Sequence, residues 1–145
     1  MRYFMNLAIE EAKKAESRGS VPVGAVIVRD DQVISTAGNE VIKNLNPIAH
    51  AEILAIHRAC LFFNSSNIKG CDIYVTLEPC AMCAQAISMS RVRRLYFGAY
   101  DIKYGAIEKL PYILDYAIHK TEVVGGVLET QCVKILQNFF IKKRF

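Results

Sequence analysis

The chain has 145 residues, a length at which one compact domain with one hydrophobic core is the usual arrangement. A hydrophobic content of 52% and a charged fraction of 22% exclude a disordered chain. No uncharged stretch approaches the roughly 18 residues that a membrane span needs, and a net charge of +4 is too small to identify a nucleic-acid-binding protein by itself. We therefore expect one domain over residues 1–145.

Hydrophobic periodicity and turn residues divide the chain into helices and strands. The first half predicts a helix over residues 2–18, strands over 23–28 and 33–36 around a turn at 29–32, a loop at 44–47 and a helix over about 49–62. The second half predicts a strand over 73–77, a helix over about 80–90, a strand over 92–98, a helix near 110–116, a strand over 122–124 and a final helix. The final helix has an apolar face that is expected to pack on the core, at Leu128, Cys132, Ile135, Leu136 and Phe139. This alternation in one short domain favours an α/β sandwich with helices on both faces of the sheet.

The cysteines indicate a reducing environment. The first residues lead into a helix and contain no signal-peptide block, so five cysteines argue against a disulfide framework. Cys60, Cys71 and Cys132 lie in apolar patterns and are expected in the core. Cys80 and Cys83 are spaced for a metal instead, and we expect a cytoplasmic protein.

Three side chains predict a zinc site with an open position. Cys80 and Cys83 begin a predicted helix, where they share one face and where the helix N-terminus favours thiolates. His50, at the start of another helix, adds an imidazole. Structural zinc sites usually have four protein ligands, whereas catalytic sites keep one position for water. Three ligands therefore predict one catalytic Zn²⁺ per chain, although a closed structural site completed by His57 or Cys71 is the alternative.

Glu52 is the predicted proton carrier of this site. On an ideal helix, side chains two residues apart diverge by roughly 200°, so His50 and Glu52 reach one metal only if it lies off the helix end. From there Glu52 can accept a proton from water, whose pKa zinc lowers, and return it to a base nitrogen and a leaving amine. A closed structural site would leave Glu52 without a role.

The order His50-Ala51-Glu52, then Pro79-Cys80-Ala81-Met82-Cys83, resembles the zinc-dependent nucleobase deaminases. Beyond these motifs, the chain is similar to the bacterial tRNA-specific adenosine deaminases over nearly its full length. The similar segments are residues 21–26, Asn39, 49–53, 74–80, 97–101, 126–128 and 139–140.

The resemblance implies a cytidine-deaminase-like fold, which is a three-layer α/β/α sandwich around a mixed five-stranded sheet. It also implies a homodimer that converts the wobble adenosine of a tRNA anticodon loop to inosine. It assigns His50, Cys80 and Cys83 to the zinc and Glu52 to proton transfer. The implied substrate-binding residues are Asn39, which would contact the flipped purine, Asp101, which would contact the sugar-phosphate, Pro79 and Phe139. For Asn39 the alternative is a turn residue, because it follows Gly38.

Some positions depart from that family's pattern. Gln85 replaces a common Gly, the run 107–110 replaces small residues, and Ile118 replaces an Asn. None belongs to the predicted zinc site, so they bear on how the anticodon loop is held.

Two other functions compete with this interpretation. A deaminase of a free base or nucleoside, such as guanine or cytosine, would use the same zinc chemistry. A non-enzymatic zinc module for RNA binding would not need Glu52. The basic cluster Arg91, Arg93 and Arg94 and the basic end Lys142-Lys143-Arg144 favour RNA, because phosphate neutralisation supplies much of nucleic-acid affinity.

Overall fold

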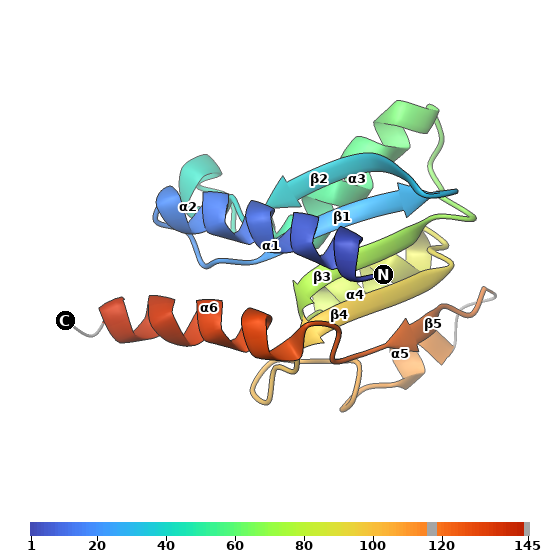
Figure 1. The fold of residues 1–145 in the computed structure, drawn as a ribbon. Helices are drawn as coiled ribbons and strands as arrows, with labels where there is room; N and C mark the ends of the chain where they lie inside the picture. Colours follow the sequence, from blue (N-terminus) through green and yellow to red (C-terminus); the bar gives the residue numbers. More distant parts are fainter. Residues whose placement is uncertain (116–118, 144–145) are drawn as a thin grey trace.

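A mixed five-stranded sheet runs through the middle of the computed structural model (Figure 1), which describes residues 1–115 and 119–143. The strands are β1 (Gly24–Arg29), β2 (Gln32–Gly38), β3 (Asp72–Leu77), β4 (Arg94–Ala99) and β5 (Glu122–Val124). Their order is β2-β1-β3-β4-β5, antiparallel from β2 to β3 and parallel from β3 to β5. The predicted sheet is confirmed.

Helices cover both faces of this sheet. Figure 1 shows α1 (Arg2–Ser17) and α6 (Glu129–Lys143) in front of it, with α3 (Ala51–Phe63) and α4 (Ala81–Met89) behind. The three-layer sandwich is therefore confirmed. Two short helices occupy connections, α2 (Val41–Asn44) and α5 (Tyr112–Asp115). Sequence patterns did not indicate α2, a single turn that ends at the left-handed Leu45. The helix predicted near 110–116 begins at Tyr112, two residues later than expected, and residue 116 lies outside the described residues.

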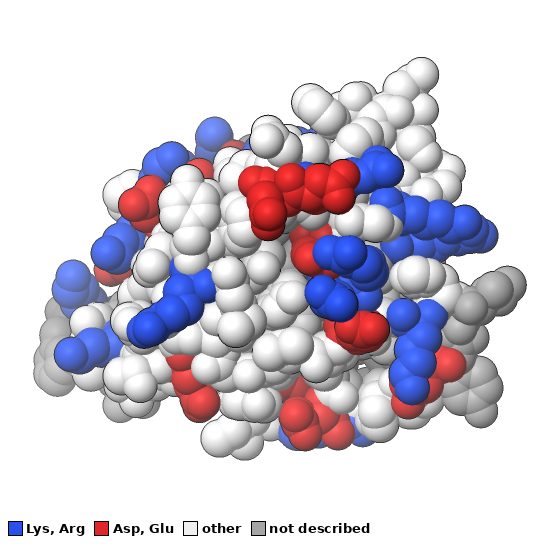
Figure 2. Space-filling model, turned by 45° about the vertical axis from the view of Figure 1, so that its right-hand side comes forward, with Lys and Arg blue, Asp and Glu red and all other residues white. Residues whose placement is uncertain are grey.

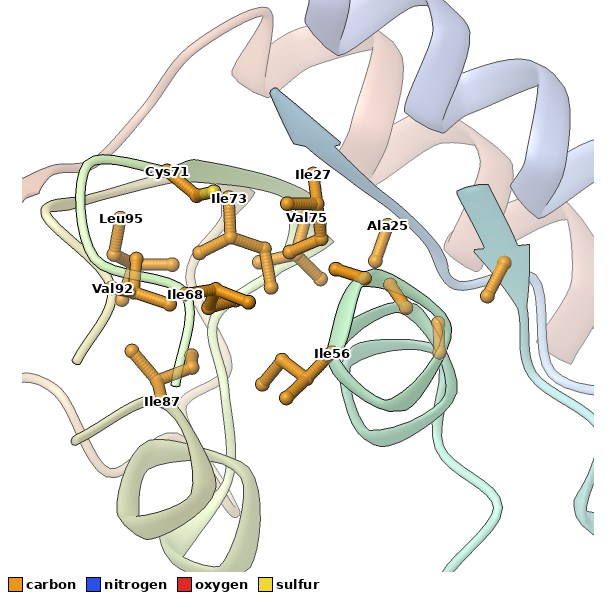
Figure 3. Close-up of a cluster of buried hydrophobic side chains, with 14 of the residues drawn as sticks. Ala25, Ile27, Ile56, Ile68, Cys71, Ile73, Val75, Ile87, Val92 and Leu95 are labelled. Carbon is orange, nitrogen blue, oxygen red and sulfur yellow. The ribbon is translucent and has the colours of Figure 1, made fainter. Parts of the chain in front are cut away.

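Alternate side chains of the central strands enter two separate cores. Ala25 and Ile27 of β1 pack with α3 and α4, whereas Val26 and Val28 pack under α1. Figure 3 shows the first core, in which strand side chains point toward Ile56 of α3 and Ile87 lies on the α4 side. Because both faces are covered, β1 and β3 are buried at nearly every position and are mostly apolar instead of alternating with polar residues.

The second core depends on a close approach between α6 and β4. A Cβ at Gly98 would collide with the Sγ of Cys132, so this strand position accepts only glycine at the observed spacing. Cys71 and Cys132 are buried as predicted, Cys60 is half-buried, and all five cysteines are free thiols.

The hairpin turn between β1 and β2 is confirmed. Arg29 pairs with Gln32, and both intervening residues, Asp30 and Asp31, have positive φ, as a type I′ turn requires. Among the described residues, no helix is both long enough and apolar enough to cross a membrane.

Candidate zinc and substrate site

The ends of two helices bring the predicted ligands together. His50 is the N-cap of α3 and Cys80 the N-cap of α4, and both have extended backbone, with ψ of 152° and 176°. Because His50 precedes the helix, the divergence expected on an ideal helix does not apply to it. His50 and Glu52 therefore line the same cavity, and the three ligand atoms of His50, Cys80 and Cys83 lie close together where α3 and α4 begin.

The three ligand atoms have the spacing of a tetrahedral zinc site. The Nδ1 of His50 lies 3.7 Å from the Sγ of Cys80 and 3.5 Å from the Sγ of Cys83. Usual zinc–ligand bond lengths place nitrogen and sulfur about 3.6 Å apart across a tetrahedral edge. Within the described part of the chain, the set of mutually close ligand atoms is these three residues alone. His57 is exposed and Cys71 is in the core, so neither closes the site.

The two thiols shift each other's pKa in opposite directions. Hydrogen bonding to Cys83 lowers the pKa of Cys80 to about 4, and the same contact, with burial, raises the pKa of Cys83. The contact with Cys80 also raises the pKa of His50. A divalent cation between the sulfurs replaces thiol protons, which is why thiolate ligands bind zinc with proton release. The donor set thus fits Zn²⁺.

Glu52 lies beside the ligands without belonging to them. Its side chain is 4% exposed, and burial raises the pKa of its carboxyl group. It lines the cavity together with His50 and Cys80. A buried carboxyl that opens onto a cavity next to a metal site can hold or release a proton close to a bound ligand.

The cavity measures about 790 Å³ and includes two of the four expected substrate contacts. Asn39 and Asp101 line it, whereas Pro79 and Phe139 are buried beside it. Phe140, four residues after Leu136, lines the wall instead of Phe139. Helical spacing could have indicated this pair, because residues four apart share one face of a helix.

Asn39 and Asp101 both shape local turns. The Oδ1 of Asn39 accepts the Val41 N–H at 2.9 Å, so the expected turn role is present alongside its place in the cavity. The Oδ1 of Asp101 accepts the N–H groups of Lys103 and Tyr104 at 3.1 and 3.0 Å. Both side chains are therefore fixed in position before any ligand binds.

The basic cluster at 91–94 lies away from this cavity. Arg93 donates to both oxygens of Asp72 at 2.9 and 2.8 Å, and Arg94 pairs with Glu122 at 2.8 Å. These pairs stand where β3 and β4 begin, and the zinc ligands follow the far end of β3, about 20 Å away for a six-residue strand. In Figure 2, Lys and Arg side chains stand beside Asp and Glu side chains and form no continuous basic face.

The basic end of α6 lies closer to the cavity, since Leu136 and Phe140 of that helix line it. The sequence around this end shows no acidic neighbour, but the fold brings Glu16 to 3.9 Å from the Nζ of Lys142. The Nζ of Lys143 lies 5.4 Å above the Phe139 ring. Arg144 is outside the described residues.

The departures from the family pattern lie outside the zinc site. Gln85 is exposed on α4. The Glu108 N–H donates to Glu78, and the Lys109 ammonium donates to the Ile102 carbonyl, so the run 107–110 stabilises the loop beside the cavity. Ile118 lies outside the described residues.

Comparison with known proteins gives the same assignment by a separate route. Residues 1–99 match the family model of the cytidine and deoxycytidylate deaminase zinc-binding region. A tRNA-specific adenosine deaminase of Agrobacterium fabrum is 46% identical over 98% of this chain and 95% of its own length. A solved structure from a study of A-to-I editing by tRNA:A34 deaminases at the wobble position is 43% identical, with a TM-score of 0.90 over 94% of this chain and all of that chain. A guanine deaminase of Bacillus subtilis is 34% identical, with a TM-score of 0.66 over 68% of this chain and 63% of its own.

Proposed function

The chain belongs to the zinc-dependent cytidine and deoxycytidylate deaminase family, among the tRNA-specific adenosine deaminases, and on this premise we propose that it converts adenosine to inosine at the wobble position of a tRNA anticodon. The observation that carries the proposal is the three-ligand site His50, Cys80 and Cys83, with buried Glu52 beside it, at one side of a cavity of about 790 Å³.

The chemistry divides between the metal and the protein. Zinc, when bound, makes water acidic enough to act as a nucleophile near neutral pH. Glu52 accepts one proton of the attacking water at its carboxylate and delivers it to the purine ring nitrogen. It then takes the second proton of the same water, from the hydroxyl now bonded to the purine carbon, and passes it to the departing amine, so that the C–N bond breaks and ammonia leaves. Asn39 hydrogen-bonds the extruded base, and Asp101 orients the attached sugar. The burial of Glu52 keeps bulk water from competing for the proton it carries.

Pro79 and Phe139 act on substrate through their neighbours. The Pro79 carbonyl accepts the Ala106 N–H at 2.9 Å and so fixes the loop that carries Asp101. The Phe139 ring packs edge-on against Phe140, with centroids 5.2 Å apart, and sets the position of that cavity-lining ring.

A deaminase of a free base is the competing function. The guanine deaminase of Bacillus subtilis is 34% identical over 68% of this chain, whereas the tRNA-specific relative is 46% identical over 98% of it. The cavity rim also carries exposed Ile102, Tyr104 and Phe140, which suit stacking against neighbouring nucleotides of a polynucleotide.

We further propose a homodimer that acts on the anticodon loop in the cytoplasm. Leu61, Phe62 and Met89 are about two-thirds exposed on α3 and α4, and apolar side chains of this size are usually covered in an assembly. Free cysteines, two of them metal ligands, require a reducing compartment such as the cytoplasm.

The experiment that tests the proposal compares the activity of the protein on tRNA with its activity on free bases and nucleosides. We expect the zinc-loaded protein to produce inosine in a tRNA with adenosine at the wobble position and to leave the same tRNA with guanosine there unchanged. Free adenosine, guanine and cytosine serve as parallel substrates, with ammonia release as the common measurement. Turnover of a free base with no reaction on tRNA would replace this proposal with the competing function.

A further inference from the structure

One buried carboxylate next to the zinc site has no part in the chemistry described above. Glu78 follows β3 directly and precedes the ligand Cys80 by two residues. Its side chain is 3% exposed. Over residues 1–115 and 119–143, no lysine, arginine or histidine forms a salt bridge with it. A buried carboxylate without a cationic partner needs hydrogen-bond donors from elsewhere.

Backbone amides at the two ends of one loop supply those donors. The Oε1 of Glu78 accepts the Asp101 N–H at 3.0 Å, and its Oε2 accepts the Glu108 N–H at 3.1 Å. Each carboxylate oxygen thus binds one end of the segment 101–108. The backbone contributes too, since Cys80 and Gly105 form an isolated β-bridge.

The segment held in this way forms one wall of the cavity. Asp101, Ile102, Lys103 and Tyr104 all line it, and Ile102 and Tyr104 are 87% and 65% exposed. Such exposed side chains pack against too little of the protein to fix their own backbone. Their distance from the zinc ligands therefore depends on hydrogen bonds to the backbone of the segment. The Pro79 carbonyl holds Ala106 in its middle, and the two bonds to Glu78 hold its ends.

We propose, resting on the proposed function, that Glu78 is a positioning residue. Its carboxylate holds the loop 101–108 at a fixed position relative to the zinc ligand Cys80, so that the loop can bind the nucleotides around the target adenosine. Hydrogen bonds to a charged group are about twice as strong as neutral ones, so one carboxylate suffices to fix both loop ends.

The test compares Glu78→Gln with Glu108→Gln. Both changes convert a carboxylate to an amide, but the Glu108 side chain is exposed and its bond to Glu78 uses the backbone N–H. In Glu78→Gln the new NH₂ group faces one of the two N–H donors, so one hydrogen bond is removed. We expect the amides of 101–108 to exchange with deuterium at least ~10-fold faster than in the wild type, with α1 unaffected and zinc content unchanged. Glu108→Gln should exchange like the wild type.

Kinetics separate positioning from chemistry. Because Glu52 and the ligands are untouched, KM for tRNA should rise about 10-fold or more in Glu78→Gln while kcat changes little. If Glu78→Gln fails to fold, Glu78→Asp tests the same two bonds, because it keeps the carboxylate but withdraws it by one methylene from the Asp101 and Glu108 N–H groups.

Unchanged exchange over 101–108 would overturn the inference, as would faster exchange in every helix, which indicates general instability. Fast loop exchange with a normal KM would also overturn it. Exchange is measured without substrate, so a wild-type protein inactive on tRNA would refute the proposed function while the exchange measurement still decides whether Glu78 holds the loop.

Discussion

At the scale of single residues, the site depends on where His50 stands relative to its helix. As the N-cap of α3 it has extended backbone, which lets its imidazole converge with Glu52 on one cavity. Glu52 sits in the first helical turn and is buried, although carboxylates are almost never fully buried without a partner or a function.

Replacement of Glu52 separates proton transfer from binding. Glu52→Ala removes the carboxyl group but no ligand atom, so we expect one zinc per chain and normal tRNA affinity. Turnover should fall by about 10²–10⁴-fold, the usual effect of removing a general acid or base. Single-turnover kinetics, metal analysis and tRNA binding measure the three quantities. The exposed Glu10→Ala on α1 is the control, and near-normal turnover in Glu52→Ala would refute the role.

At the scale of elements, α6 shows what hydrophobic patterns in the sequence can and cannot predict about a helix. Its apolar positions correctly predicted burial for Cys132 and Phe139. The same pattern placed Leu136 in the core, and Leu136 is half-buried against it. Leu136 and Phe140 also line the cavity, because the helix passes along its edge. Hydrophobic periodicity predicts which face of a helix packs against the rest of the protein. It does not predict whether part of that face lines a cavity, because this depends on how the helix is placed in the fold.

The end of α6 is also where binding to RNA phosphates is expected. Truncation after Ile141 removes Lys142, Lys143 and Arg144 and leaves the buried positions of the helix intact. We expect normal zinc content and weaker tRNA binding. The slope of log affinity against log salt should flatten by about 0.7–0.9 for each phosphate that the truncated protein no longer neutralises. Because Glu16 partly neutralises Lys142, the change should be smaller than that for three phosphates.

The matched control for this truncation removes cations at the other end of the sheet. Lys69 and Arg91 are exposed and precede β3 and β4. Lys69→Ala with Arg91→Ala deletes these two charges and should leave affinity and salt slope nearly unchanged. An unaltered slope in the truncated protein would instead show that this end of α6 binds no phosphate.

At the scale of the whole molecule, sequence patterns predicted the sheet, the layers and the zinc ligands well. They succeeded because apolar runs such as β1 and β3 and the His50, Cys80, Cys83 spacing are local signals. They could not show that arginines of the 91–94 cluster are paired with carboxylates, because the pairing of Arg93 with Asp72 comes from strand register. The role of Glu78 was equally invisible, since its partners are backbone amides more than 20 residues away.

Zinc is expected to stabilise the whole fold because it joins α3 to α4. The ligands His50 and Cys80 lie 30 residues apart in sequence, and an unfolded chain does not hold them together. Removal of zinc by a chelator should lower Tm by at least ~5 °C, because a ligand present well above its Kd stabilises the folded state that binds it. Cys83→Ala should bind no zinc and respond little to the chelator, and calorimetry with metal analysis measures both.

Cys60→Ala is the control for that measurement, since Cys60 is a half-buried thiol remote from the ligands. It should keep one zinc and the full response to the chelator. Full zinc occupancy in Cys83→Ala would disprove the ligand assignment.

The positions of the site residues along the chain have a consequence for how such enzymes diverge in substrate. The metal ligands and Glu52 all lie within residues 1–99, the part that matches the general deaminase family. The exposed part of the cavity wall, from Ile102 to Tyr104 and at Phe140, comes after it. The reaction machinery and the base contact Asn39 thus precede the exposed wall along the polypeptide. We therefore expect relatives that act on the same base in different surroundings to differ most in their last third.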